Sequence, residues 1–159
     1  MMRPPLIRRA TAADAPALAA LWNPWITDTA TTFASTVKTA DDVARMIATR
    51  PAFFTTDDVQ GFATYGQFRN GNGYATCMEH TVVLSPTARG HGLGRALMQA
   101  VESHARSHGA HQMMAGISAE NPAAIDFHAK IGYRHTATIA QAGFKFGRHI
   151  DLVLMQKFL

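Results

Sequence analysis

The stretch from Glu79 to Arg95 carries the residues of this 159-residue chain that are best placed for chemistry. It predicts a buried strand, a turn in which Gly90, Gly92 and Gly94 alternate, and a helix that begins where the turn ends. Glycine lets the backbone approach a ligand closely, and a helix N-terminus offers unpaired N–H groups and a positive dipole. The stretch therefore predicts a site for an anionic ligand; the alternative is that the glycines serve only tight packing.

Two familiar phosphate-binding motifs do not match this turn. A Walker loop places Lys and then Ser or Thr after its last glycine, whereas Arg95 and Ala96 follow Gly94. A dinucleotide-binding turn needs the spacing G-x-G-x-x-G, whereas the three glycines here occupy every second position. We therefore expect neither a Walker-type nucleotide site nor a Rossmann-type dinucleotide site.

Other clusters are weaker candidates for chemistry. His104 and His108 share a face of one predicted helix and His111 follows it, but no cysteine or carboxylate completes a metal site, so we expect no metal. Cys77 has no recognisable catalytic partner and is expected to pack as a small apolar side chain. The G-x-S-x-G turn of serine hydrolases is missing from the sequence.

Helices and strands that could position the glycine-rich turn follow one another along the chain. Thr11 with Asp14, and Thr39 with Asp42, are capping-box-like signals for two early helices, while the Thr-rich and aromatic segment 23–37 is expected to be a loop. A long helix is predicted from Gly92 to the stop signal at 109, and another from 121–122 to 132. Strands are predicted at 6–9, in several runs within 51–84, and at 113–117, 133–140 and 150–156.

The resulting order, β-α-α-β-β-β-α-β-α-β-β, is typical of an α/β domain with one mixed, mostly antiparallel sheet. The composition favours a single domain over residues 1–159, because 47% of the residues are hydrophobic and no linker divides the chain. No apolar run approaches the ~20 residues that span a membrane, and one cysteine cannot build a disulfide framework. We therefore expect a soluble, cytoplasmic protein.

Charge does not single out a macromolecular partner. Fifteen Lys and Arg residues against eleven Asp and Glu residues give a net charge of +4, which suits an anionic small molecule. Nucleic-acid binding favours a basic stripe with aromatic platforms, whereas the basic residues here are scattered. The sequence therefore predicts binding to neither nucleic acid nor membrane.

Several of these residues resemble the motifs of the GNAT acyltransferase superfamily. Arg89, Gly92 and Gly94 match its coenzyme A-binding motif R-x-x-G-x-G, and a later helix matches its N-x-x-A pattern at Asn121 and Ala124. Within the superfamily the chain is most similar to phosphinothricin and methionine sulfone or sulfoximine N-acetyltransferases. This narrower resemblance covers essentially the whole chain and is carried by Asn23, Thr32, Phe33, Phe68, Arg69, Glu79, His80, residues 143–148, Asp151, Met155 and Gln156.

The resemblance implies a GNAT fold in which two splayed strands hold acetyl-CoA, with no metal. The diphosphate would lie on N–H groups of the glycine-rich turn, and the pantetheine arm would pair with the strand before it. One main-chain N–H, expected to be that of Val83, would stabilise the thioester oxygen. The implied cofactor-binding residues are Val82, Val83, Leu84, Arg89, Gly90, His91, Gly92, Leu93, Gly94, Arg95 and Asn121.

The resemblance also implies direct attack of an amine on the thioester. Glu79 stands where the family keeps a carboxylate and is the candidate base, with a pKa expected to be raised by its apolar neighbours. His128 stands where many GNAT enzymes have tyrosine and is the candidate proton donor to the departing thiolate. The alternatives are that Glu79 is a substrate anchor or a structural carboxylate, and that His128 is a structural core residue.

For the substrate, the resemblance implies a small amino acid or an analogue of one. Arg69 matches the family position for binding the substrate carboxylate, with an exposed structural arginine as the alternative. The other implied substrate-binding residues are Glu79, His80, Phe33 and Lys145. His149 replaces a tryptophan that the narrower family tends to carry, which leaves the preferred amino acid open.

The leading expectation is therefore an acetyl-CoA-dependent N-acetyltransferase that detoxifies an amino-acid analogue and, like its family, forms a homodimer. One alternative is an enzyme that acetylates a protein or peptide amine. The other is a non-catalytic module that binds acyl-CoA.

Overall fold

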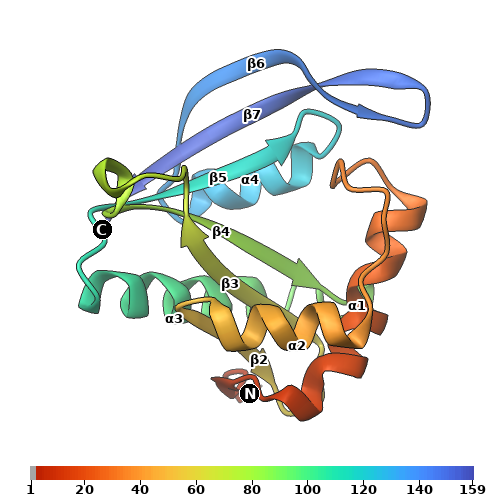
Figure 1. Cartoon of the computed structure of the whole chain (residues 1–159), viewed down its shortest axis with the longest axis vertical. Helices are drawn as coiled ribbons and strands as arrows, with labels where there is room; N and C mark the ends of the chain where they lie inside the picture. Colours follow the sequence, from red (N-terminus) through yellow and green to blue (C-terminus); the bar gives the residue numbers. More distant parts are fainter. Residues whose placement is uncertain (1–2) are drawn as a thin grey trace.

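A twisted seven-stranded sheet forms the centre of the computed structural model, which describes residues 3–159 (Figure 1). The strand order is β1-β2-β3-β4-β5-β7-β6, and every neighbouring pair is antiparallel except β4 and β5. The predicted element order and the mixed, mostly antiparallel sheet are thereby confirmed. The strands are β1 (Ile7–Arg9), β2 (Ala52–Thr56), β3 (Gly61–Gln67), β4 (Cys77–Leu84), β5 (Gln112–Ser118), β6 (Arg134–Lys145) and β7 (Arg148–Phe158).

Two pairs of helices cover the two faces of the sheet (Figure 1). On one face α1 (Ala15–Asp28) and α2 (Ala40–Thr49) pack on aromatic residues of β2 and β3. On the other face α3 (Leu93–Ser107) packs on β2, β3 and β4, and α4 (Pro122–Lys130) packs on β5 and β6. Short 3-10 turns lie at 12–14, 72–74 and 86–88. None of the helices between residues 3 and 159 is both long and apolar enough to cross a membrane.

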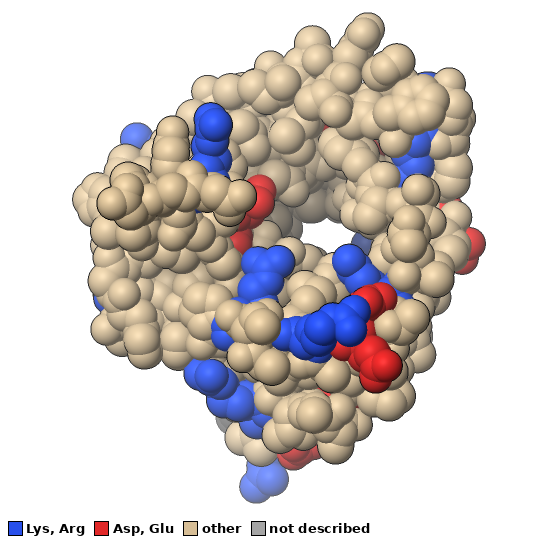
Figure 2. Space-filling model, in the orientation of Figure 1, with Lys and Arg blue, Asp and Glu red and all other residues tan. Residues whose placement is uncertain are grey.

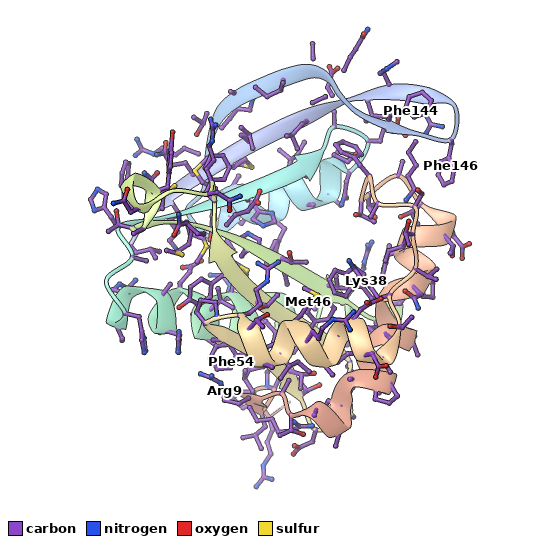
Figure 3. All side chains as sticks on the ribbon, viewed as in Figure 1. Arg9, Lys38, Met46, Phe54, Phe144 and Phe146 are labelled. Carbon is purple, nitrogen blue, oxygen red and sulfur yellow. The ribbon has the colours of Figure 1, made fainter. Side chains whose placement is uncertain are left out.

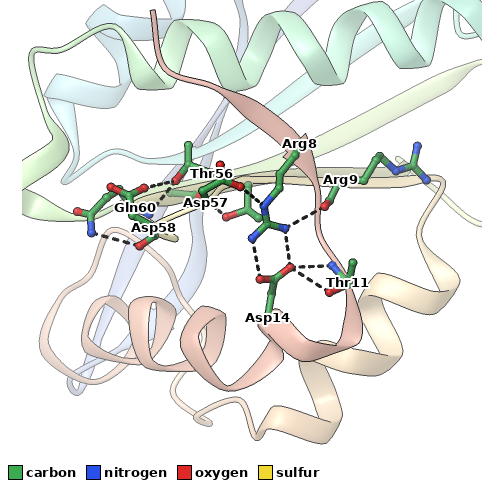
Figure 4. A network of polar contacts seen from close by, with 10 residues as sticks. Arg8, Arg9, Thr11, Asp14, Thr56, Asp57, Asp58 and Gln60 are labelled. Atoms are coloured by element: carbon green, nitrogen blue, oxygen red, sulfur yellow. Dashed lines mark hydrogen bonds and ion pairs between the residues drawn. The ribbon is translucent and has the colours of Figure 1, made fainter. Parts of the chain in front are cut away.

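The start of α1 is tied to the edge of the sheet by charge. The Arg8 guanidinium donates to both carboxylate oxygens of Asp14 at 2.8 and 2.9 Å, and its Nε donates to Asp57 at 2.7 Å (Figure 4). Asp14 also accepts from the N–H of Thr11, so one carboxylate serves both the predicted helix start and the ion pair. Hydrogen bonds from Arg8 lower the pKa of Asp14 to about 2.

The segment 23–37 is not a loop throughout, because α1 continues through its first six residues to Asp28 even though Pro24 lies inside the helix. Ile26 is fully buried one turn after Trp22, so the apolar stripe of α1 extends across the proline. Burial here outweighs the local cost of the proline, and the prediction of a loop at 23–28 was wrong.

The last two strands are longer than predicted. β6 and β7 form a hairpin that projects beyond the sheet, joined by a two-residue turn at Phe146 and Gly147 with φ of 52° and 74° (Figure 1). Both turn residues therefore adopt the left-handed conformation expected of a tight hairpin. The extension was missed because β6 is mostly exposed, so its residues lack the apolar alternation by which a strand is recognised.

Candidate active site

The parallel pair β4–β5 separates partway along its length, and the separation creates a gap in the sheet. Only three register pairs join the strands, the last being Glu79 with Met114. Beyond it, β4 stays paired with β3 as far as Leu84, and β5 stays paired with β7 as far as Ser118. Because each strand is held by its outer neighbour, the two diverge in a V (Figure 1). The last register pair places Glu79 at its apex.

A cavity of about 760 Å³ lies at this gap and is lined by both strands, by the start of α3 and by one side of α4. Figure 2 shows it as a hollow that opens through the molecule, with basic side chains along part of its border. Trp22, Trp25 and the loop that carries Phe33 line it from the α1 side. A ligand could therefore enter between the two strands and be reached from both faces of the sheet.

The open edge of β4 exposes alternate main-chain groups. The bonds Phe68 N to Cys77 O (2.9 Å) and Ser85 N to Gln60 O (2.8 Å) flank the β3–β4 ladder, so odd-numbered β4 residues bond to β3 and even-numbered ones face the gap. The carbonyl of Leu84, which is not used by β3, accordingly accepts from the indole N–H of Trp25 in α1, at 3.1 Å. By the same alternation the N–H of Val82 is directed into the gap.

The glycine-rich turn places unpaired N–H groups at one end of the cavity. Gly90 and Gly92 have φ of 80° and 79°, a left-handed conformation that favours glycine, and both line the cavity. The first helical bond of α3 runs from Ala96 N to Gly92 O, which leaves the N–H groups of Leu93, Gly94 and the next residue without a partner in the helix. These donors and the helix dipole suit a diphosphate.

Basic and closely packed residues complete this end of the cavity. The Arg89 guanidinium lies 5.3 Å from the Trp25 ring centre, and the side chains of Arg95 and Lys130 add to the cavity lining. A Cβ atom on Gly94 would lie only 3.2 Å from the Phe127 ring, so this glycine allows α3 and α4 to approach each other. The pocket thus combines a positive end with an apolar gap, as a coenzyme A thioester requires.

Glu79 lies at the apex of the V. Burial raises the pKa of its carboxyl above the ordinary value, against a smaller opposing effect of Arg50. Gly116, which the sequence analysis missed, makes room for this carboxylate, because a Cβ atom there would lie 3.0 Å from Glu79 Oε2. A glycine inside an otherwise apolar strand was the available signal, since it often marks a close approach.

Two buried histidines, His80 of β4 and His128 of α4, contact each other on the face of the sheet that α3 and α4 cover. His80 Nε2 and His128 Nε2 are 3.2 Å apart, and His128 Nδ1 lies 2.7 Å from the carbonyl oxygen of Ala124. That oxygen can only accept, so His128 carries its hydrogen on Nδ1, and the neutral ring accepts at Nε2 from His80. His80 Nδ1 is then a bare acceptor, with no hydrogen-bond partner among residues 3–159.

Burial keeps this pair neutral. It lowers the pKa of His128 and, together with the charge of His128, lowers the pKa of His80 to about 3. The unfolded chain therefore binds more protons than the folded one once the pH falls below about 6.5. We expect the free energy of unfolding to fall with decreasing pH, and His80, with a folded pKa of about 3, should contribute about 1.4 kcal/mol per pH unit.

Urea unfolding at pH 6.5, 5.5 and 4.5 measures this slope. The variant His80→Gln keeps a donor for His128 but removes the titrating ring, so its slope should be shallower than that of the unmodified protein. His135→Gln, at an exposed strand position, is the matched control and should leave the slope unchanged. Equal slopes in the protein and the His80 variant would contradict the assignment of a buried neutral pair.

The other predicted substrate residues are dispersed. Phe33 lines the cavity and packs against Gly143 of β6, where a Cβ atom would lie 2.5 Å from its ring. Lys145 is buried, and its ammonium group donates to the carbonyls of Ile26 (2.6 Å) and Thr32 (2.8 Å); burial lowers its pKa. It therefore holds the loop that carries Phe33 and is not part of the cavity lining.

Arg69, His91 and Asn121 occupy different surroundings. Arg69 is exposed with its guanidinium 5.4 Å from the Tyr74 ring, and neither it nor the exposed His91 lines the cavity. Asn121 lines the cavity and also caps α4, because its side-chain oxygen accepts from Ala124 N at 3.2 Å. Among residues 3–159, no three His, Cys, Asp or Glu side chains lie close enough to share a metal ion.

Comparison with known proteins agrees with this geometry. Residues 16–133 match the model of the acetyltransferase (GNAT) family. The L-amino acid N-acyltransferase of Escherichia coli is 36% identical, over 94% of this chain and 91% of its own length. The L-methionine sulfoximine/L-methionine sulfone acetyltransferase of Salmonella typhimurium is 34% identical, over 94% of this chain and 92% of its own length.

Solved structures of acetyltransferases have the same fold as this chain. An acetyltransferase of Salmonella typhimurium, solved with its cofactor acetyl-CoA, superposes with a TM-score of 0.92 at 32% identity, covering 99% of this chain and 95% of that one. A ribosomal-protein-alanine N-acetyltransferase of Brucella melitensis also reaches a TM-score of 0.92, at 35% identity, covering 97% of this chain and 99% of that one. The names of these proteins are those of acyl- or acetyltransferases, and where an acceptor is named it is an amino acid, an amino-acid analogue or a protein alanine.

Proposed function

Because this chain belongs to the GNAT family of acetyltransferases, we propose that it transfers the acetyl group of acetyl-CoA to the α-amine of a small amino acid or of an analogue such as methionine sulfone, methionine sulfoximine or phosphinothricin. The proposal depends above all on the position of Glu79 in the cavity. Its carboxylate lies at the apex of the V, beside the point where a thioester in the gap would meet an amine arriving from the α1–α2 face.

The cavity supports acetyl-CoA as the donor. The unpaired N–H groups of Leu93, Gly94 and Arg95 would bind the diphosphate, and Arg89 would add a positive charge beside it. The open edge of β4 would pair with the amides of the pantetheine arm, with Asn121 contacting the arm from α4. The names of two relatives concern amino-acid acceptors, and one solved neighbour contains acetyl-CoA.

In the proposed reaction the amine nitrogen forms a bond to the acetyl carbon as the carbon–sulfur bond of the thioester breaks. Glu79 accepts a proton from the amine, directly or through a water molecule, and its raised pKa suits this role near neutral pH. The ladder alternation favours the N–H of Val82 over that of Val83 as the donor to the thioester oxygen, since Val83 bonds toward β3. We propose His128, which lines the cavity, as the source of the proton that the departing thiolate takes up. Because its Nδ1–H donates to the Ala124 carbonyl, the neutral ring must first gain a proton at Nε2.

We propose a homodimer as the working form. Ile139, Phe144 and Phe146 expose 44%, 60% and 54% of their surface along the projecting β6–β7 hairpin, and Figure 3 shows the two phenylalanines at its far end. An apolar surface of this kind is typical of a protein–protein contact. Sedimentation at several concentrations would measure the molecular mass in solution.

A thiol-release assay tests the proposed function. With acetyl-CoA as donor, we expect release of coenzyme A with methionine sulfone, methionine sulfoximine or phosphinothricin, and little with an N-terminal alanine peptide of the kind that a protein acetyltransferase would accept. Turnover of the peptide alone would favour acetylation of a protein alanine, the reaction named for the Brucella melitensis structure. Binding of acetyl-CoA without thiol release from any amine would indicate a non-catalytic binding module.

A further inference from the structure

Arg50 is a cation beside the proposed base that the sequence analysis did not single out. Arg50 is the C-cap residue of α2. Its N–H donates to Met46 O at 2.9 Å, and its backbone is extended. Pro51 follows, and a residue before proline is disfavoured in the helical conformation. The chain therefore leaves α2 at Arg50, whose side chain extends from the helix end over strand β3.

The guanidinium of Arg50 lies directly over Gly66. A Cβ atom at Gly66 would be 2.5 Å from an Arg50 Nη atom, so any larger residue on β3 would displace the guanidinium. Gly66 does not have a left-handed φ, so the space taken by Arg50 accounts for the glycine better than a backbone requirement does. Gly66 thus leaves the space in which the positive charge of Arg50 lies over β3.

The position of the Arg50 guanidinium over Gly66 is next to Glu79. Gly66 and Glu79 are register partners of the antiparallel β3–β4 pair, so their side-chain positions share one face and lie about 5 Å apart. The Nη atom of Arg50 is thus within about 8 Å of Glu79 Cβ, on the face covered by α1 and α2. Arg50 is exposed to solvent, and it takes no part in the five ion pairs found among residues 3–159.

From this juxtaposition we infer that Arg50 binds the α-carboxylate of the acceptor amino acid while Glu79 receives the proton from its ammonium group. The inference rests on the proposed function and names the residue that selects free amino acids. One carbon atom separates the two groups of an α-amino acid, which suits a cation held over β3 and a carboxylate on the neighbouring strand β4. A guanidinium binds a carboxylate through two parallel hydrogen bonds and would hold the amine in a fixed direction. Neither Arg50 nor Arg69 is part of the cavity lining, but Arg50 lies beside Glu79. Arg69 lies against Tyr74 and is then not the anchor.

The test compares methionine sulfone with 3-(methylsulfonyl)propylamine, the amine that lacks only its carboxylate. We expect the unmodified enzyme to prefer methionine sulfone strongly. In Arg50→Ala, kcat/KM for methionine sulfone should fall on the order of 100-fold, mainly through KM, while kcat/KM for the amine stays within about twofold. Gly66→Ala keeps the charge but displaces it, and should reduce the same preference at least about fivefold.

Arg45→Ala is the matched control, because Arg45 is an exposed arginine of α2 that pairs with Asp42. It should leave both substrates unchanged. An equal loss on both substrates in Arg50→Ala, with a shifted pH profile, would mean that Arg50 acts only on the charge of Glu79 and would overturn the inference.

Full activity in Arg50→Ala together with a selective loss in Arg69→Ala would also overturn it, in favour of the anchor expected from the sequence. Failure of the proposed function gives a different result. In that case the unmodified enzyme acetylates no free amino acid at all, and the inference fails with it.

Discussion

Glu79→Gln should reduce kcat roughly 100- to 10 000-fold near pH 7 with little change in the KM for acetyl-CoA. Gln has nearly the same shape as Glu, so the V between β4 and β5 and the close contact with Gly116 are kept. What the variant lacks is a group that can take a proton from the acceptor ammonium. Steady-state kinetics with methionine sulfone, from pH 6 to pH 10, measures the effect.

The pH dependence distinguishes a base from an anchor. Because the pKa of Glu79 is raised by burial, kcat/KM of the unmodified enzyme should rise with pH through a value above that of an ordinary glutamate, as the carboxylate becomes ionised. In Glu79→Gln this limb should vanish, and the defect should shrink toward pH 10, where the amine is already deprotonated.

Asp126→Asn, which removes an exposed carboxylate from α4, is the control and should retain full activity at every pH. A defect in Glu79→Gln that is confined to the KM of the amino acid and stays constant with pH would assign Glu79 to substrate anchoring.

The fold was largely predictable because most of its elements have local signals. Thr39 and Asp42 form the predicted capping box, Asn121 caps α4 as expected, and the mixed sheet follows from the order of elements. The elements that were misjudged are those whose local signals oppose their tertiary contacts. Pro24 suggests a loop where the burial of Ile26 continues α1, and the exposed β6 lacks alternation although its pairing with β7 makes it a strand.

The candidate site was predictable only where one segment of chain builds it. The glycine-rich turn and the strand before it are contiguous, so Gly90, Gly92 and Gly94 predicted a site for an anionic ligand, with tight packing as the alternative, and the resemblance carried by Arg89 implied coenzyme A. The contacts that join distant segments left no pattern of their own. Arg50 reaches Gly66 and Glu79 only through the packing of α2 on β3, and the direction of the Val82 N–H depends on the register of β3 and β4.

Gly92→Ala should weaken the binding of acetyl-CoA at least about tenfold, equivalent to about 1.4 kcal/mol, as measured by calorimetry with the purified protein. Gly92 lines the cavity with φ of 79°, and a Cβ atom there meets nothing within 4 Å, so it would project into open space at the entrance to α3. The methyl group would occupy part of the diphosphate site, and the alanine would also disfavour the left-handed backbone that presents the N–H groups.

Gly109→Ala separates the two effects, because this glycine lies just beyond the other end of α3 with φ of 87° and also has nothing within 4 Å of its Cβ position. Both variants should lose about 1 kcal/mol of unfolding free energy from the same backbone strain. Only Gly92→Ala should lose affinity, since Gly109 is not part of the cavity lining. Equal affinities in the two variants would mean that the diphosphate does not bind at the N-terminus of α3, and the roles proposed for Leu93, Gly94 and Arg95 would then be wrong.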